Sequence, residues 1–591
     1  MSEVTIAGAG AAGCTLALLL SRYGIRCTVL ERRTDPFGHP AAHVINARSQ
    51  EIWHRASPAL ARRIAALAAP AEETSVIRWF TDLHHAPLGD IDLLADTAQV
   101  ETVRNHSRFL ISHIGQHLLM PVLWDALVLD PHIDFQRGVH IRDVTMRSES
   151  ATVHTDSRDD TAEISSRFVI GADGANSTVR DALGIAMRGP ELANMGSVFF
   201  NAKLFPHGIR PLLSWIYSPA FCGVLIAHAD DDYVLMTPYL SRHQEIARDG
   251  RAFWARALPR VIGRHVPFRI HSTGTWTMTS QTAEFFARGN VILAGDAAHR
   301  FPHTGGFGLN SGVQDAHNLA WKLAAVLEGR APTSLLHSYE SERRPVVERF
   351  AEQSVANHFR LDDVMDGLGV SNRALAQVSR VFAHPVVDGS PAVIVEKIAD
   401  RLMNLSMRRT AKLLGDRPSA RDLRAAVERR ISAQLEHFAS TGLEFGYAYS
   451  GALIRTESTP QPMDGEGVVH YRPTTWPGAR VPHVWLSGGS EAMSTHDVLD
   501  LRDYTLFTLD PQAWCAVVPE ADPVSVVGLD RAIAARQRVL ELFEVGEHGA
   551  VLVRPDGHVV WRTTDCAASA ASQLRRCLGD VEISLATEVG S

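Results

Sequence analysis

The sequence of 591 residues has no apolar run approaching the roughly 18 residues that a membrane-spanning helix needs. It also lacks a basic excess: 58 Lys and Arg face 66 Asp and Glu, so the formal net charge is −8 and non-specific nucleic-acid binding is not expected. The first residues enter a strand pattern without a basic segment and an apolar segment, which argues against a secretory signal. We therefore expect a protein with no membrane or nucleic-acid partner.

Cysteine is scarce and scattered. The six cysteines include no Cys-x-x-Cys pair, so neither a disulfide framework nor a zinc site is indicated, and no metal is expected. Reduced thiols in a cytoplasmic protein fit this usage best. The length and the 45% hydrophobic content suit two to four globular domains.

A short β-prone run at residues 4–7 leads directly into a glycine-rich turn. Gly8, Gly10 and Gly13 form the pattern GxGxxG, a helix pattern covers residues 14–23, and a second strand, residues 27–30, ends in Glu31. Such glycines permit a tight turn, close approach of a pyrophosphate and helix–strand packing, while the acid takes ribose hydroxyls. This unit predicts dinucleotide binding and leaves open whether the dinucleotide is NAD or FAD.

A second strand–turn–helix stretch begins at an apolar strand over residues 290–294. Asp296 follows the strand, glycines recur through residues 305–308, and a helix pattern starts near Asn310 and runs to about residue 328. A glycine loop before a helix presents free N–H groups and a positive dipole end to an anion. The acid is placed to hold a polyol hydroxyl. Taken alone, the stretch fits a plain turn with a surface Asp equally well.

Between these two stretches lie a third turn and a change of pattern. The apolar strand 168–170 is followed by Asp173 and Gly174 and then a helix start. From residue 196 to 279 the runs become β-rich and aromatic, which predicts a mostly antiparallel sheet. Such a sheet beside a cofactor is a natural substrate wall. For any single residue, ordinary sheet core is the better explanation than a pocket role. The candidate pocket residues are Phe200, Trp215, Tyr217 and Met236.

The remaining segments complete a predicted layout. Helical patterns dominate residues 351–450, residues 451–480 are rich in Pro, Gly and Thr and read as a linker, and residues 481–591 alternate strands and helices. A turn at Pro555, Asp556 and Gly557 predicts a hairpin. We expect an α/β fold with this order: Rossmann-like dinucleotide-binding domain 1–195, β-rich substrate domain 196–280, return of the first domain 281–350, helical segment 351–450, linker 451–480 and C-terminal domain 481–591.

The three turns in this order resemble those of single-component FAD-dependent aromatic hydroxylases, the group of p-hydroxybenzoate and phenol hydroxylases. The likeness covers residues 1 to about 350. Residues 477–486 and 553–558 resemble the thioredoxin-like C-terminal domain of the phenol-hydroxylase branch, which is not a redox domain there. Residues 39–48 and 442–449 are most similar to the 2,4-dichlorophenol 6-monooxygenase type.

The resemblance implies an FAD site built from three turns. Glu31 would bind the ribose of the AMP half, Asp296 the ribityl chain, and Gln116 would lie along the flavin, while Asp173 is associated with both flavin and NADPH. The helix start would face the N1/O2 edge of the flavin ring. The residues implied in cofactor binding are Gly8, Ala9, Gly10, Ala12, Gly13, Glu31, Arg32, Arg48, Gln116, Asp173, Asp296, Gly308, Leu309 and Asn310.

The chain departs from the family pattern near the reacting face. His43 aligns with an acid of phenol hydroxylases and is our candidate base for the phenolic proton, with a packing role at the flavin edge as the equal alternative. Ala41 replaces a family Arg, which leaves a pyrophosphate contact that Arg48 is a candidate to supply. Pro302 and His303 replace Pro-Pro, and we expect both near the substrate. A ring larger than a simple chlorophenol is compatible with these changes.

The predicted activity is therefore hydroxylation of a phenolic ring by FAD, with NADPH or NADH as reductant and O₂ added through a C4a-hydroperoxide of the flavin. The partners are a small aromatic substrate and O₂, and the family implies a homodimer formed through the C-terminal domain. The rival readings are a Baeyer–Villiger or oxidase reaction on the same scaffold and a flavin redox sensor. Product identification and the stimulation of NADPH oxidation by phenols separate them.

Overall fold

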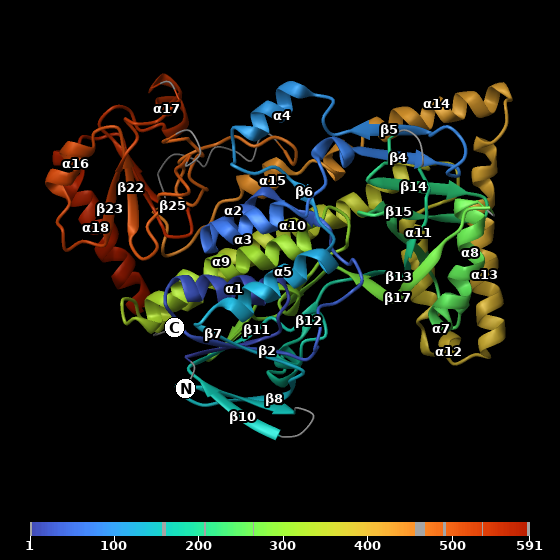
Figure 1. Cartoon of the computed structure of the whole chain (residues 1–591), viewed down its shortest axis with the longest axis horizontal. Coiled ribbons are helices and arrows are strands. Elements are labelled where there is room, and N and C mark those ends of the chain that lie inside the picture. Colours follow the sequence, from blue (N-terminus) through green and yellow to red (C-terminus); the bar gives the residue numbers. More distant parts are fainter. Residues whose placement is uncertain are drawn as a thin grey trace.

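The computed structural model describes residues 3–156, 161–205, 209–263, 265–455, 467–487, 492–534 and 536–587. Three regions follow one another along the long axis of the molecule (Figure 1). A central α/β body holds the N-terminal strands. A β-rich region bordered by long helices lies at one end, and the C-terminal domain lies at the other.

The central sheet brings the predicted turns to one edge. Its order is β19 (Ala287–Arg288), β20 (Val291–Leu293), β11 (Phe168–Gly171), β1 (Val4–Ala7), β2 (Cys27–Glu31) and β7 (Ile133–Arg137), parallel except at β19. The turns with Asp296, Asp173 and Gly8 follow three adjacent strands, and Glu31 ends the next one. Ligands of open parallel sheets bind at these carboxyl ends. The strands that follow β7 form a separate antiparallel sheet of β8 (His140–Met146), β9 (Ala151–Asp156) and β10 (Thr161–Ser166).

A second sheet of seven strands forms the β-rich region. Its order is β17 (Arg269–Thr279), β13 (Glu191–Asn201), β16 (Asp232–Tyr239), β15 (Phe221–Ala227), β14 (Leu213–Ser218), β4 (Val76–Phe80) and β5 (Gly89–Asp92). It is antiparallel except where β14 runs beside β4. The last two strands at one side of this sheet, β4 and the edge strand β5, thus come from residues 76–92, outside the predicted span of 196–280. Helix α8 (Gly250–Ile262) packs on one face, through Trp254.

Long helices cover the other face of this sheet. Val355 and Phe359 of α10 (His337–Val364) pack against Val224 and Met236. Next in the chain come α11 (Asn372–Phe382), α12 (Pro385–Asp388), α13 (Ala392–Arg408), α14 (Pro418–Ser432) and α15 (Thr441–Gly446). In the described ranges, no helix is both long and apolar enough to span a membrane.

The C-terminal domain has a mixed four-stranded sheet in the order β23 (Val524–Gly528), β22 (Tyr504–Thr508), β24 (Ala550–Val553) and β25 (Val559–Thr563). Helices α16 (Pro511–Val517), α17 (Arg536–Phe543) and α18 (Ala567–Thr587) complete a βαβαββα order, as expected for a thioredoxin-like fold. Gly557, with φ of 82°, turns the predicted hairpin. Residues 456–466 of the expected linker lie outside the described residues. The part that follows is packed rather than solvated, because Thr475 and Arg480 are buried.

Candidate FAD site and substrate cavities

The first and last glycine turns are in contact, although 287 residues separate Gly8 from Gly295. A Cβ atom built on Gly8, where φ is 95°, would lie 2.5 Å from the Ala172 carbonyl oxygen of the Asp173 turn. One built on Gly295 would lie 3.1 Å from the Ala12 side chain. Glycine is needed at these positions because three backbones meet there. The three turns therefore form one site, as an extended dinucleotide requires.

The cradle expected for a pyrophosphate is open at Gly10. A Cβ atom added there would meet nothing within 4 Å, whereas one on Gly13 would lie 2.0 Å from the Gly8 carbonyl oxygen. Gly13 therefore serves helix packing, and Gly10 leaves room for an approaching group. No side chain caps the start of α1 (Ala11–Arg22), so its first-turn N–H groups face this space without a protein acceptor. The site fits an anion.

Helix α9 presents a second uncapped start. It spans Phe307–Leu327, so it begins three residues before the predicted Asn310, and its N-cap is Gly306 in the left-handed region without a side-chain cap. Gly308 and Leu309 lie in the first turn, where backbone N–H groups have no intrahelical acceptor. A helix start of this kind stabilises negative charge, which suits the reduced ring that we predict there.

The Glu31 carboxylate holds the first turn. It is 6% exposed, and its Oε2 accepts the Ala9 N–H at 2.9 Å while Oε1 accepts the Arg33 N–H at 3.0 Å. Each oxygen retains a lone pair for a ribose hydroxyl. Arg32 is exposed. The ribose contact of Glu31 and the cofactor contact of Arg32 therefore stay predictions.

The two aspartates differ. Asp173 caps α6 (Thr178–Ala182): its Oδ1 accepts from Ser177 Oγ at 2.5 Å and its Oδ2 accepts the Val179 N–H at 3.1 Å. Asp296 is the only exposed residue between Val291 and His299. Desolvation nevertheless raises the pKa of the Asp296 carboxyl. A carboxyl that is both accessible and desolvated lies in a hollow, as expected for one that faces a cofactor.

A buried carboxylate supports the Asp296 turn from behind. Asp315 of α9 accepts the Gly295 N–H at 3.0 Å, and the same oxygen lies 2.6 Å from His299 Nε2. Its other oxygen accepts from Arg343 Nε at 2.8 Å. The contacts with His299 and Arg343 lower the pKa of Asp315 to about 2 in spite of its burial. The sequence analysis missed Asp315, because inside a helix pattern it carries no motif.

Three predicted cofactor residues have protein partners. Arg48 donates to Glu51 Oε2 at 3.1 Å and to the Asp556 carbonyl at 2.9 Å, so its contacts give the predicted pyrophosphate role no support. Gln116, at the start of α5 (Gln116–Leu129), donates its N–H to the Ala42 carbonyl at 2.8 Å and fixes the loop that bears His43. The Asn310 amide donates to the Val44 carbonyl at 2.9 Å and joins that loop to α9.

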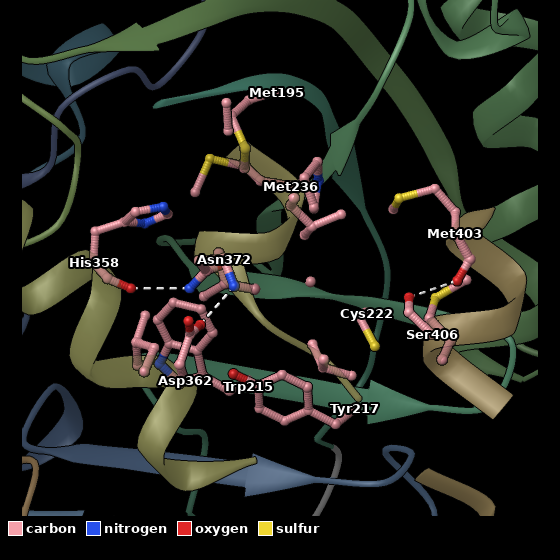
Figure 2. A pocket seen from close by; sticks show the side chains of 18 of the residues that line it. Met195, Trp215, Tyr217, Cys222, Met236, His358, Asp362, Asn372, Met403 and Ser406 are labelled. Carbon is pink, nitrogen blue, oxygen red and sulfur yellow. Dashed lines mark hydrogen bonds between the residues drawn. The ribbon is translucent and has the colours of Figure 1, made fainter. Parts of the chain in front are cut away.

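Two cavities adjoin the start of α9. The proximal cavity, about 680 Å³, is lined by His43, Gly305 and Gly306 among others, and the distal cavity measures about 800 Å³. Trp215, Val224, Met236 and His303 line both, so the cavities share a wall. In Figure 2 the distal cavity lies between the second sheet and the helical segment, with Met195 and Met236 on one side and Met403 and Ser406 on another.

Four of the six predicted pocket residues line these cavities: Trp215, Tyr217, Met236 and His303. Phe200 does not, and the prediction for it is wrong. It is fully buried with Tyr233 and Trp254 on the opposite face of the sheet, because neighbouring residues of a strand alternate between faces. Pro302 lines neither cavity; its carbonyl accepts from Ser354 Oγ at 3.1 Å. The helical segment also supplies lining residues that the patterns did not single out: His358, Leu361, Asp362, Asn372, Met403, Met407, His437 and Ser440.

The proximal cavity carries a pair of neutral imidazoles. His43 Nδ1 lies 3.4 Å from His113 Nδ1. Burial lowers the pKa of His43 to about 4 and that of His113 to about 3. His303 adds to the lowering at His43, and His43 adds to the lowering at His113. Both rings are therefore uncharged at pH 7. Among the described residues, no group of three or more His, Cys, Asp or Glu is arranged to hold a metal ion.

Comparison with known proteins agrees with this geometry. The FAD binding domain family matches residues 1–354, and the family of the aromatic-ring hydroxylase C-terminal domain matches residues 474–581. The chain belongs to the FAD binding domain family, and within it to the flavin-dependent aromatic-ring monooxygenases. The cofactor is FAD.

Individual relatives cover nearly the whole chain. A 2,4-dichlorophenol 6-monooxygenase of Cupriavidus pinatubonensis is 28% identical over 98% of this chain and 96% of its own. A tetracenomycin A2 monooxygenase-dioxygenase of Streptomyces glaucescens is 28% identical over 97% and 96%. Among solved structures, the flavin-dependent monooxygenase PieE in complex with FAD and substrate is 29% identical, with a TM-score of 0.83 and 99% coverage of both chains.

Proposed function

We propose that the chain hydroxylates a phenolic substrate that occupies the proximal cavity and extends into the distal one. The observation that carries this proposal is the position of the proximal cavity, whose wall includes Gly305 and Gly306 immediately before the uncapped start of α9. The flavin ring is predicted at that helix start, so a substrate ring in the proximal cavity would lie against it. Mostly apolar walls with a few polar groups suit an aromatic ring with one or two hydroxyls.

Bound FAD would supply the redox chemistry, with NADPH or NADH as electron donor and O₂ as oxidant. The chain's own residues have narrower tasks. The turns at Gly10, Glu31 and Asp296 bind and orient the cofactor, and Trp215 and Met236 exclude water from the substrate ring. Two adjacent cavities with shared lining residues favour a substrate of more than one ring.

His43 is proposed to contact the substrate hydroxyl as a neutral hydrogen-bonding partner. The lowered pKa of His43 makes it a weaker base than the sequence analysis suggested. His43 lines the proximal cavity, so it can still contact a substrate bound there. We expect His43→Ala to leave FAD bound and to reduce hydroxylation, with more of the reduced oxygen released as peroxide. Unchanged turnover and coupling across pH 6–9 would remove His43 from the reaction.

The activity is tested with holoenzyme, NADPH and a panel of phenols from one to four rings. A hydroxylase will oxidise NADPH faster when a phenol is present and will yield a product that carries one additional oxygen on the ring. Catalase controls separate this from uncoupled peroxide release. An oxygen inserted into a carbon–carbon bond would support the Baeyer–Villiger alternative. Slow oxidation that no phenol stimulates would support a redox sensor.

We also propose a cytoplasmic homodimer. The family resemblance implies a dimer formed through the C-terminal domain. A separate apolar face of the kind that subunit contacts cover lies on α13 of the helical segment, where Ile394, Ile398, Leu402 and Leu405 are exposed. Light scattering at micromolar concentration tests the mass, and a monomer would refute the assembly. Cell fractionation tests the location.

A further inference from the structure

A buried carboxyl lies directly behind the wall of the proximal cavity. Ser440 lines that cavity and is 9% exposed, and its Oγ donates to Glu444 Oε1 at 2.6 Å. Glu444, in the short helix α15, is 7% exposed. The Ser440 oxygen keeps its lone pairs for a donor in the cavity. A hydroxyl of a bound ring that donates to Ser440 would thus be one hydrogen bond away from a buried carboxyl.

Among the residues that the structure describes, no charged group is paired with Glu444. Burial raises the pKa of its carboxyl to about 7, and hydrogen bonds from Ser440 and Asn46 oppose this rise. Asn46 precedes α2 (Ala47–Ala56), where Arg48 is paired with Glu51. Arg480 of the C-terminal domain stacks over Phe445 and is paired with Glu51 as well. His437, on the preceding turn, is neutral because burial lowers its pKa to about 3.

The carboxyl is also tied to the flavin side of the cavity. Asn46 donates its backbone N–H to Asn310 Oδ1 at 3.0 Å, and Asn310 lies in the first turns of α9. The segment that bears His43 and Val44 therefore runs between Glu444 and the helix start. This arrangement fixes the Ser440–Glu444 pair relative to the place where the reacting ring is proposed to lie.

The alternative proton acceptor in the same wall is weaker. His43 has a pKa of about 4, which is about three units below that of Glu444. The carboxylate of Glu444 is therefore the stronger base of the two. Acceptors work best when their pKa lies near the operating pH, and Glu444 meets that condition.

We propose that Ser440 and Glu444 together take the proton of the substrate hydroxyl, with Ser440 in contact with the substrate and Glu444 as the final acceptor. The proposal rests on the phenol-hydroxylating function proposed above. The O–H bond of the substrate breaks and its proton binds Ser440 Oγ, while the serine proton passes to Glu444 Oε1. One negative charge moves from the carboxylate to the substrate oxygen, so protons and charge balance. The resulting phenolate ring is the better nucleophile.

The first experiment observes the carboxyl itself. Infrared difference spectra of FAD-loaded wild type minus Glu444→Gln, recorded from pH 5 to 9, should show a protonated carboxyl that disappears as the pH rises through about 7. A carboxyl ionised throughout this range would overturn the proposal. Flavin absorbance and melting temperature establish that Glu444→Gln, which preserves size and shape, is folded and loaded.

The second experiment uses the phenol that best stimulates wild-type NADPH oxidation. We expect Glu444→Gln and Ser440→Ala each to lower the hydroxylation rate at pH 7.5 by about 100-fold, within the range of general base catalysis, and to abolish the rise of the rate with pH near 7. Glu444→Asp should keep that rise at a reduced rate. The matched control is Glu428→Gln, which removes an exposed carboxyl of α14.

The outcomes separate the two proposals. If no phenol stimulates wild-type oxidation, the proposed function fails. If phenols stimulate it and Glu444→Gln retains the wild-type pH profile, the function stands and the proton route is wrong. If Glu444→Gln loses the profile while Ser440→Ala retains it, Glu444 does not act through Ser440, and the route as proposed is overturned.

Discussion

Helix α10 borders a region of buried ion pairs near its start and a neutral, mostly apolar cavity further along. Near its start, Glu342 accepts from Lys322 Nζ at 2.8 Å and from Arg554 at 2.5 and 3.0 Å, and Arg343 donates to Asp315. All of these groups are fully buried. Further along, the same helix presents His358 and Leu361 to the distal cavity, where burial lowers the pKa of His358 to about 4.

The difference separates two tasks. Buried ion pairs are costly to break, so the ionic region fixes how the C-terminal domain, α9 and the Asp296 turn fit together. The cavity region keeps its imidazoles neutral and its walls apolar, which suits an uncharged ring and leaves room for a carboxyl to titrate near pH 7. The C-terminal domain thus contributes to the cofactor site by positioning it, without a redox pair of its own.

The largest expected effect comes from breaking the ionic region at its centre. Glu342→Ala leaves Lys322 and Arg554 buried with one carboxylate fewer, and such losses typically cost about 3–5 kcal/mol. The melting temperature should fall clearly, as scanning calorimetry would measure. Glu352→Ala, which removes an exposed carboxyl of the same helix, is the control. Equal melting temperatures for both variants would contradict the assigned role of the ionic region.

A smaller effect is expected at the cofactor turn. Asp315→Asn retains the side-chain size but removes the charge that Arg343 and His299 meet, and a charged hydrogen bond is worth about 1.5–3 kcal/mol. The Gly295 turn should loosen and FAD should bind about ten- to a hundredfold more weakly. Fluorescence of released flavin gives the affinity, with Asp363→Asn as the exposed control. Wild-type affinity in Asp315→Asn would show that this carboxylate does not support the turn.

The smallest effect concerns the neutral region. His358 and His437 have folded-state pKa values of about 4 and about 3, below the ordinary 6.5. As the pH falls below 6.5, the unfolded chain binds protons that the folded chain does not, so stability decreases from pH 6.5 towards 4. Each buried histidine should lower the free energy of unfolding by about 1–2 kcal/mol between pH 6.5 and pH 5. Melting temperatures across this range test it, and His437→Leu should flatten the slope. A slope that His437→Leu leaves unchanged would argue that this ring does not contribute.

Local patterns predicted the cofactor turns better than the cavity. The glycine spacing at Gly8 to Gly13 and the acid at Glu31 are short-range features of one βαβ unit, and the structure places them at the expected sheet edge. Phe200 was misassigned because an aromatic strand does not reveal which of its faces meets a cavity. Arg48 has one partner nearby in Glu51, but the other, the Asp556 carbonyl, is 508 residues away in the C-terminal domain, a distance that no local pattern spans.

The Ser440–Glu444 pair shows the same limit. Residues 442–449 stood out through a family likeness, yet nothing in their spacing connects a glutamate of a short helix to a cavity. Only its hydrogen bond to Ser440 and its burial beside Asn46 give that carboxyl a chemical role.

By itself the sequence determined the class of fold, because glycine-dependent turns and strand–helix alternation are written in neighbouring residues. It also indicated a dinucleotide cofactor, since the glycine spacing and Glu31 suit a pyrophosphate and a ribose, and the family resemblance of the three turns implied FAD. The tertiary structure alone decided which side chains share the substrate cavity and which charges are paired. Those properties depend on burial and on distances between segments that the chain order does not encode.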